Sequence, residues 1–595
     1  MKLFKSIILS VAGLMTFASC TDWLDVNEDP NTPAQAAVSV KTLLPWIQYH
    51  LAYATGAHGY RSQFICQAFT ATSRTHRDGC SAQWEATSSL STTSYQQFFV
   101  GAGPNLVDMY DKAIASEAWH YAGAAKLLKA YGFLLMADMY GEMPYFEANS
   151  ISPHPKYDTG ETIYTESLKD IDEAIEQFGK TQAVGQPALS EGDSWNGGNI
   201  DKWVKMAYLL KARTINQMSK KSAYYDPETI LDCLNKAQQS IDDDTYIECQ
   251  DIRESSKDFI STDPMQTNYN WNQTYNGNRH ITLPTKWLVD LLTDFDNKGI
   301  EDPRADKIIA WRQFSENGTK IWKRGAGVDM QSDVRIPNGM ANFISRKEGG
   351  WNPSIDTRAS DSIYVGIYAG SVGVYSTPNI FYRAIDNWYP SSGNVYVRPN
   401  SPYLWATYAE ACFIKAEVLF KQSKKTEAFN AYKDGIKANI DELNKMLTIW
   451  TGDAAYTDCP SMGQMEQVKI DEFLNGAIGT ASDITLEKIM SQKFIAMLYS
   501  TVNWNDMRRH DYKNYMGWQM PYEYSVNAAS LKGIPQGKQW RRIKQCSHEI
   551  NYNADQLRAI QPNYNDDDIW MFIPEISWAI SPMISLTVIP LIIFS

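Results

Sequence analysis

The stretch Trp119–Glu147, WHYAGAAKLLKAYGFLLMADMYGEMPYFE, decides how the fold of this chain is interpreted. Its apolar residues recur at steps of three and four, the spacing of one face of an α-helix. They are Ala124, Leu127, Leu128, Tyr131, Leu134 and Leu135. Lys126 and Lys129 fall on the opposite, polar side. Gly141 can adopt the left-handed conformation that closes a helix, and Pro144 prevents the helix from resuming soon after. The sequence therefore predicts a long buried helix that stops abruptly.

Three pairs of helical segments accompany this stretch. The pairs begin near residues 105 and 119, 159 and 201, and 404 and 425, with the last pair spanning 404–420 and 428–443. Asp158, followed three residues later by Glu161, is the expected N-cap of the second pair. The spacing of the pairs is irregular and lacks the roughly 34-residue period of a true tetratricopeptide array. We therefore predict a mainly α fold, in which irregular tetratricopeptide-like helix hairpins form a scaffold.

The composition changes between about residues 250 and 400, where Asn, Gly, Tyr and Trp crowd together. Convincing helices there are confined to Leu283–Asp296, with a further turn near Ile308. We expect a loop-rich lobe built over the scaffold. Earlier in the chain, residues 34–66 carry apolar positions at helical spacing, and Pro45 should kink or restart a helix there.

The N-terminus has the pattern of an export signal. Lys2 and Lys5 precede an apolar run over 7–17, and Ala-Ser-Cys follows, ending at Cys20. This order is typical of a secretory signal peptide, and the apolar run is too short to span a bilayer as a permanent helix. A Cys at the cleavage point resembles the bacterial lipobox, which implies diacylglycerol on Cys20 and removal of residues 1–19. An ordinary signal peptide with an incidental Cys is the alternative.

Charge and cysteine content exclude several classes of partner and site. The formal charge of −13 repels phosphate backbones and anionic lipid headgroups, so we expect no nucleic-acid partner. The cysteines after Cys20 are scattered and form no C-x-x-C pair, which argues against a zinc site and indicates buried small hydrophobic residues. The sequence does not decide whether one or two disulfides form. Asp25, Asn27 and Asp29 alternate like the start of a calcium loop, but Pro30 stands where the turn needs Gly. We predict no metal and no cofactor.

No enzyme motif is present. The chain lacks H-E-x-x-H, G-x-x-x-x-G-K-[ST], and a G-x-G-x-x-G between a strand and a helix. Glu410 and Glu417 lie seven residues apart on one helix face, which could suggest acid–base chemistry, but we interpret them as structural. We predict no catalytic residues, with a secreted glycoside hydrolase as an alternative because carboxylates are abundant.

Aromatic residues within polar loops give the positive signal for function. Sugar rings present C–H faces that pack on Trp and Tyr, while amide and carboxylate side chains bond the hydroxyls. Such binding needs no charge on the ligand, which suits an acidic surface. The expected ligand-binding residues are Trp84, Trp271, Asn272, Tyr275 and Trp351. Trp84 and Trp271 come first, because their neighbours are polar and no apolar period runs through them, and Tyr275 and Trp351 come next.

Several separated motifs together resemble one family. The motif D-x-Y-G-x-x-P-Y from Asp138 to Tyr145 is similar to a motif of the SusD/RagB nutrient-binding outer-membrane lipoproteins of Bacteroidetes. Further matches are IYTESLKDIDEAIE at 163–176, D-P-R at 302–304 and W-x-D-x-R-R at 504–509. Arg213 stands where this family usually has Arg.

The resemblance implies a surface lipoprotein that sits on a TonB-dependent, SusC-like outer-membrane transporter and has no chemistry of its own. It would capture a glycan, or alternatively a peptide, and deliver it inward. Acidic residues just after Cys20 resemble the signal for the outer cell face. The organisation expected from the whole sequence is a signal peptide at 1–19, a lipidated tether at 20–33, a helical scaffold at 34–249 and 401–568, a loop-rich ligand-binding lobe at 250–400 and an atypical apolar tail at 569–595.

The tail departs from the family pattern. Residues 578–595 carry no charge, but Pro582 and Pro590 interrupt them. A second membrane anchor, an added buried strand and a reading-frame slip are the alternatives that this stretch leaves open.

Overall fold

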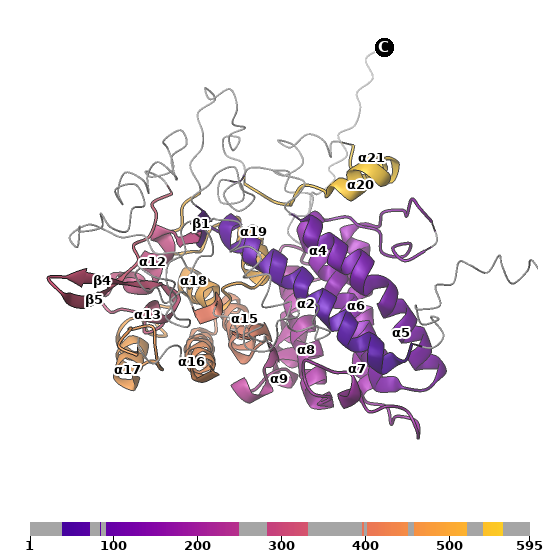
Figure 1. The fold of residues 1–595 in the computed structure, drawn as a ribbon, viewed down its shortest axis with the longest axis horizontal. Coiled ribbons are helices and arrows are strands. Elements are labelled where there is room, and N and C mark those ends of the chain that lie inside the picture. The colour runs from indigo at the N-terminus through magenta and orange to yellow at the C-terminus, as the bar shows by residue number, and fades with distance from the viewer. Residues whose placement is uncertain are drawn as a thin grey trace, which may run out of the picture.

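The computed structural model describes residues 38–71, 84, 91–150, 152–248, 282–330, 395–397, 401–449, 457–520 and 539–562. Helices dominate this part of the chain (Figure 1), so the predicted mainly α class is confirmed. The predicted long helix is α6, Trp119–Tyr140. It ends where expected, because Gly141 has a φ of 86° and its N–H bonds the carbonyl of Ala137 at 2.8 Å.

The first part of the scaffold consists of helices that run mostly side by side (Figure 1). They are α2 (Val40–Ile65), α4 (Thr92–Gln96), η2 (Gln97–Ala102), α5 (Gly103–Ala115), α6, α7 (Gly160–Phe178), α8 (Ile200–Gln217) and α9 (Pro227–Lys236). The second part comprises α15 (Tyr408–Lys421), α16 (Lys425–Ile449), α17 (Gln467–Gly476), α18 (Leu486–Ala496), α19 (Val502–Arg509), α20 (Ser547–Tyr552) and α21 (Ala554–Ile560).

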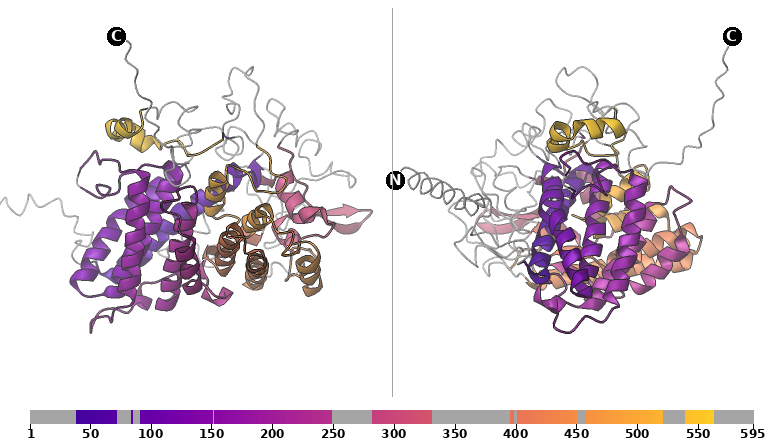
Figure 2. Two further views of the ribbon diagram at one scale, coloured as in Figure 1. Left: turned by 180° about the vertical axis from the view of Figure 1, so that it is seen from behind. Right: turned by 90° about the vertical axis from the view of Figure 1, so that its right-hand side faces the viewer.

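The expected helix pairs are present as α5 with α6, α7 with α8, and α15 with α16, and each pair is in contact. The two parts of the scaffold meet where α15 packs on α8 and α9. The left view of Figure 2 shows the earlier helices, in indigo to magenta, beside the later ones in orange. Between them in sequence lie α12 (Lys286–Thr293), η5 (Phe295–Asn297) and α13 (Ala305–Ile308). These short helices fall within the predicted 283–296 segment and near the predicted turn at Ile308.

The described strands form three two-stranded antiparallel sheets. The pairs are β1 (Phe69–Ala71) with β3 (Thr282–Pro284), β2 (Thr245–Ile247) with β6 (Tyr403–Ala406), and β4 (Trp311–Glu316) with β5 (Thr319–Arg324). Short 3-10 turns connect the elements at Leu189–Glu191, Ile241–Asp243 and Val395–Val397.

Two predicted helix starts are wrong by a few residues. Thr159, not Asp158, is the N-cap of α7, because its hydroxyl accepts from the N–H of Thr162. The Asp158 carboxylate instead accepts from the N–H groups of Tyr145 and Phe146, and so holds the extended segment after α6. Helix α15 begins at Tyr408 rather than at 404, because residues 403–406 pair with β2 as a strand.

Helix α2 runs through Pro45 as one element, so the helix does not restart there. A proline inside a helix removes one backbone hydrogen bond, here the one that would reach the carbonyl of Lys41, at a typical cost of about 3 kcal/mol. That oxygen faces the backbone of Gly192, where a Cβ would lie only 2.5 Å away. Burial of Leu44, Ile47 and their neighbours offsets the missing bond.

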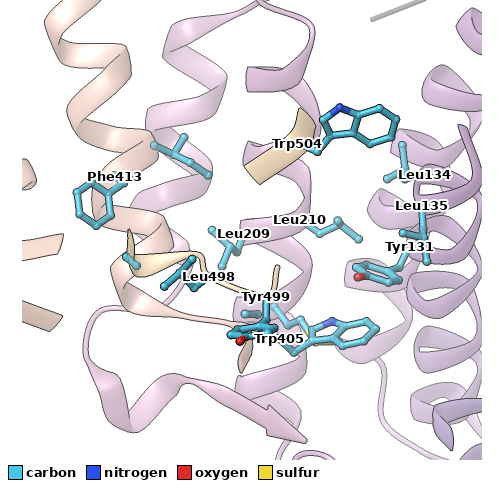
Figure 3. Packing of buried hydrophobic residues seen from close by; sticks show 14 of the residues in the cluster. Tyr131, Leu134, Leu135, Leu209, Leu210, Trp405, Phe413, Leu498, Tyr499 and Trp504 are labelled. Atoms are coloured by element: carbon cyan, nitrogen blue, oxygen red, sulfur yellow. The ribbon is translucent and has the colours of Figure 1, made fainter. Parts of the chain in front are cut away.

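The core lies where α6, α8 and the C-terminal helices meet, and Figure 3 shows its packing. Tyr131 of α6 contacts Trp405 of β6 with ring centroids 4.2 Å apart. Leu209 and Leu210 of α8 lie between this pair and Phe413 of α15. The core therefore joins residues from both parts of the scaffold.

Cysteine and membrane expectations can be compared with part of the chain. The described cysteines, Cys66, Cys233, Cys412, Cys459 and Cys546, are free and buried, as the interpretation of small hydrophobic residues requires. Within the described ranges, no helix has the length and apolarity that a bilayer crossing demands. The tether, Cys20 and the apolar tail lie outside the described residues.

Candidate functional site

The end of α2 and the start of α12 are held together by a short backbone frame. Strand β1 pairs with β3 in the register Phe69↔Pro284, Thr70↔Leu283 and Ala71↔Thr282. The Thr285 hydroxyl donates to the carbonyl of Gln67 at 2.5 Å and caps α12 by accepting from the N–H of Leu288. The N–H of Val328 bonds the carbonyl of Pro284 at 2.9 Å, and that of Lys286 bonds the carbonyl of Val328 at 2.8 Å. Three segments distant in sequence therefore meet at one edge.

Gly327 is required for this approach. A Cβ at this position would lie 2.4 Å from the Cα of Lys286 and 2.6 Å from the carbonyl oxygen of Thr285. Both atoms belong to backbone, which cannot move aside as a side-chain tip can. A larger residue would therefore push residues 327–330 away from α12.

A surface cavity of about 240 Å³ opens over this frame, and we call it the α12 groove. Its lining comes from the segment after α2, from α12 and its N-cap, from the segment after β5 and from the segment after α19. The lining residues are Gln67, Thr285, Lys286, Trp287, Asp290, Val328, Asp329, Met330, Gly517 and Gln519.

The α12 groove offers the mixture of groups that a neutral polar ligand needs. Lys286 and Gln519 carry exposed donors, and Asp290 carries an exposed acceptor. Trp287 is half-buried, with its ring 4.8 Å from that of Phe494 and its indole N–H bonded to the carbonyl of Met516 at 2.8 Å. These contacts fix the orientation of an aromatic ring that lines the cavity.

The sequence did not single out Trp287, although a signal was present. In KWLVDLLT, the buried residues are Leu288, Leu291 and Leu292, which leaves Lys286 and Asp290 on the outer face. The exposed face of α12 was thus readable from its periodicity. Its position beside Gln67 was not, because that depends on the pairing of β1 with β3.

Trp84 lies in the core and not at the surface. Its side chain is 3% exposed, and its ring packs on Tyr512 at 5.0 Å and on Trp540 at 6.4 Å between centroids. Its indole N–H donates to the carbonyl of Ile65 at 2.8 Å, at the C-terminal end of α2, where helix carbonyls lack helical partners. The expectation that Trp84 stacks on a ligand is therefore wrong for this structure, because neither face of the ring is free.

The other expected binding residues, Trp271, Asn272, Tyr275 and Trp351, lie outside the described residues. The chain on either side of them can be placed. Thr282, which follows residues 249–281, pairs with Ala71 next to the α12 groove. Met330, which precedes residues 331–394, lines the groove. Both segments that carry expected aromatic residues are thus attached to the chain at this site.

Glu410 and Glu417 do not form a catalytic pair. Glu410 receives hydrogen bonds from the Nε and Nη2 of Arg213, both at 2.6 Å. Glu417 is fully buried against Arg509, with further contacts from Asn216 and Lys421. Although burial alone would raise it, the nearby Arg509 and Lys421 hold the pKa of Glu417 well below its usual range. The structural interpretation of both carboxylates is confirmed.

A second buried carboxyl pair was missed by sequence reasoning. Burial raises the pKa of Glu442 to about 7, and burial together with repulsion from Glu442 raises that of Asp244 well above its usual range. The N–H of Tyr408 donates to Asp244 at 2.6 Å, at the start of α15. The pair belongs to the joint between β2, α15 and α16. Its position among helix ends and backbone donors marks it as structural.

The residues that carry the family resemblance also lie in the core. Asp138 accepts from Tyr164 and Asn505, and its backbone carbonyl accepts from Arg508 at 2.6 Å. Arg304 is fully buried and bonds both carboxylate oxygens of Asp302, at 2.9 and 2.6 Å. These motifs therefore hold the scaffold together and do not line the α12 groove. Among the described residues, no group of three or more His, Cys, Asp or Glu is arranged to hold a metal ion.

Comparison with known proteins supports the family resemblance of these motifs. A family model described as "Starch-binding associating with outer membrane" matches residues 30–347, and one described as "Susd and RagB outer membrane lipoprotein" matches residues 356–570. No curated protein matches the chain.

Solved structures share the fold at low sequence identity. A SusD/RagB family protein from Bacteroides thetaiotaomicron is 19% identical with a TM-score of 0.59, over 91% of this chain and 99% of that one. A SusD-like protein of Bacteroidetes AC2a is 17% identical with a TM-score of 0.63, over 90% of this chain and 100% of that one. A chitin-binding protein is 18% identical with a TM-score of 0.61, over 91% of this chain and 100% of that one. With both halves matched by family models, the chain belongs to the SusD/RagB family of outer-membrane lipoproteins.

Proposed function

We propose that the protein is a cell-surface lipoprotein that binds oligo- or polysaccharides at the α12 groove and delivers them to a TonB-dependent transporter. The observation that carries this proposal is the groove itself, in which an oriented Trp287 lies beside exposed amide, ammonium and carboxylate groups. The starch-binding description of the family model and the fold shared with a chitin-binding protein favour a glycan ligand.

The chemistry of the groove favours binding over catalysis. Hydroxyl groups both donate and accept, so a sugar can bond Lys286, Asp290 and Gln519 together. Lys286 and Asp290 are already paired with each other along the exposed face of α12, at a spacing of four residues. A neutral ligand can add to this pair without separating it, whereas a strongly charged ligand must compete with it.

The expected aromatic residues remain part of the proposal. Trp271, Asn272, Tyr275 and Trp351 belong to segments whose neighbouring described residues lie at the α12 groove. We propose that these side chains extend the binding surface. Trp84 is no longer included, because its ring is buried in the core.

Anchoring and delivery rest on the sequence and on the family. A lipid on Cys20 would hold the protein at the outer membrane, with residues 20–33 as the tether. Delivery to a SusC-like transporter explains why a binding protein would be placed there, since bound glycan must still cross the membrane. Replacing Cys20 with Ala should release the protein from the membrane fraction while leaving glycan binding by the soluble chain unchanged.

The first test is calorimetric binding of the soluble chain, beginning after Cys20, to a panel of polysaccharides, oligosaccharides and peptides. Release of reducing ends is assayed in the same samples. We expect binding of at least one glycan without turnover. Binding of peptides alone would favour peptide capture by the same architecture, and release of reducing ends would establish a glycoside hydrolase instead.

Variants then locate the surface. Trp271→Ala and Trp351→Ala should each weaken binding of the glycan found in the panel, because each removes a stacking face worth about 1 kcal/mol or more. Trp46→Ala is the matched control, since Trp46 is 50% exposed but lies near the start of α2, roughly 30 Å along the helix from Gln67. Equal weakening by all three variants would contradict the proposed location.

A further inference from the structure

One wall of the α12 groove comes from residues 516–519, which we call the wall segment. Gly517 and Gln519 line the groove and are exposed, whereas Met516 and Trp518 are half-buried. The wall segment belongs to no described helix or strand. Its position therefore depends on bonds that its individual residues make to other parts of the fold.

The first residue of the wall segment is bonded to two helices. The carbonyl of Met516 accepts from the indole N–H of Trp287 on α12 at 2.8 Å. The N–H of Met516 donates to the hydroxyl of Ser491 on α18, also at 2.8 Å, and Ser491 is fully buried. This end of the wall segment is thus held by side chains of α12 and α18.

Trp518 attaches the wall segment to the end of α2. Its indole N–H donates to the carbonyl of Cys66, the C-cap of α2, at 3.0 Å. The last carbonyls of a helix lack helical partners, so a donor from elsewhere in the fold satisfies this one. The residue after Cys66 is Gln67, which lines the groove. One hydrogen bond therefore joins the wall segment to the backbone beside Gln67.

Two tryptophans donate to successive carbonyls at this helix end, and they differ in their surroundings. The indole N–H of Trp84 donates to the carbonyl of Ile65 at 2.8 Å, and its ring is buried in the core. Trp518 is half-buried, stacks on Tyr512 with ring centroids 5.3 Å apart, and stands in the chain between two residues that line the groove. Only the second indole is thus linked directly to the groove wall.

We propose that Trp518 is a positioning residue of the α12 groove, which fixes the amide of Gln519 relative to Gln67. The indole is not among the residues that line the groove, so it acts through its neighbour in the chain. A wall that is already in place spares the ligand the entropic cost of ordering it on binding. This inference rests on the proposed function, because the α12 groove must be the site that holds the glycan.

The first test is hydrogen exchange of the ligand-free soluble chain, followed by mass spectrometry. The variant Trp518→Phe keeps an aromatic ring against Tyr512 and removes the donor to Cys66. We expect faster exchange in peptides that cover residues 515–520, because the wall segment loses its attachment to α2. Unchanged exchange there would overturn the proposal, whether or not the groove holds a glycan.

The second test is calorimetric titration with the glycan found in the panel. Trp518→Phe should bind it roughly tenfold more weakly, because the ligand must then order the wall. In a chain that already carries Gln519→Ala, the same change should have a much smaller effect, since the amide that Trp518 positions is gone. Equal effects in both backgrounds would show that Trp518 does not act through Gln519 and would overturn the proposal.

Trp84→Phe is the matched control, because it removes an indole donor from the preceding carbonyl of the same helix end. It should lower Tm without weakening glycan binding. Lys437→Ala, which removes an exposed cation paired with Asp441 on α16, should change neither. Equal loss of affinity in Trp84→Phe and Trp518→Phe would indicate general destabilisation and overturn the proposal. If the unmodified chain binds no glycan, the proposed function fails, and the exchange measurement alone decides whether Trp518 holds the wall.

Discussion

The interior of the scaffold and the α12 groove each contain an ion pair between a basic and an acidic side chain, but the first pair is buried and the second is exposed. In the interior, Arg509 and Glu417 form an ion pair in which both side chains are 0% exposed. In the groove, Lys286 and Asp290 form an ion pair in which both are exposed. The buried pair holds helices α15 and α19 in one arrangement, whereas the exposed pair leaves its groups available to a ligand. Family identity is therefore carried by residues that do not line the groove.

The energetic weight of the two pairs follows from their surroundings. A buried ion loses its hydration, and its partner must replace that loss, so removal of one member leaves an uncompensated charge. An exposed pair is hydrated and screened, and contributes little. The interior should tolerate very few substitutions, while the groove can change its side chains and so its ligand.

The largest effect is expected from Arg509→Met. This change leaves Glu417 and Asp506 buried without the guanidinium that bonds both, with the bond to Asp506 at 2.8 Å. We expect a loss of about 3–5 kcal/mol in the free energy of unfolding, measured by chemical denaturation. Unchanged stability would show that the buried ion pair does not hold α15 and α19 in their arrangement.

The second prediction concerns pH and the buried pair Asp244 and Glu442. The folded chain holds a proton on Glu442 up to about pH 7, above the ordinary value, so the stabilisation is complete at low pH and is lost as pH rises to about 7. Glu442→Gln should flatten this dependence and stabilise the protein at pH 8, on the order of 3 kcal/mol. The measurement is Tm against pH for both proteins. Parallel profiles would contradict the assignment.

The third prediction tests the corrected role of Trp84. Trp84→Phe keeps an aromatic ring in the core but removes the N–H that bonds the carbonyl of Ile65. A buried acceptor left without a partner costs about 1–3 kcal/mol, so Tm should fall while glycan affinity stays the same. Loss of glycan affinity at unchanged Tm would contradict the core role and support a role for Trp84 in ligand binding.

The smallest effect on stability is expected for Lys286→Ala. Like Arg509→Met, this change removes the cation of an ion pair. Here, however, both members of the pair are exposed, and they lie about one turn apart on the same helix. We expect a change in the free energy of unfolding too small to resolve by the same denaturation experiment. A destabilisation comparable to that of Arg509→Met would remove the distinction between the two regions.

The sequence predicted the scaffold well because local signals and burial agree there. Helix α6 followed from its apolar spacing and from Gly141, and the structure places both as expected. Errors arose where long-range contacts override local pattern. Helix α2 continues through Pro45 because Leu44 and Ile47 beside it are buried, and residues 403–406 form a strand because β2 lies beside them.

The binding site was less predictable for the same reason. Polar neighbours in the sequence suggested that Trp84 is exposed, but its ring fills a space between residues around 512 and 540 that no local pattern reveals. The α12 groove depends on the meeting of Gln67, α12, residues 328–330 and residues 517–519. Periodicity could identify the outer face of α12, but not the elements that adjoin it.

The most direct test of the account is a calorimetric titration of the glycan found in the panel against the double variant Lys286→Ala, Gln519→Ala. Both side chains are exposed and line the α12 groove, so their removal should leave Tm unchanged. The account predicts binding about tenfold weaker, equivalent to about 1.4 kcal/mol, with Lys437→Ala unchanged as the control. Affinity equal to that of the unmodified chain would contradict the claim that the α12 groove holds the glycan.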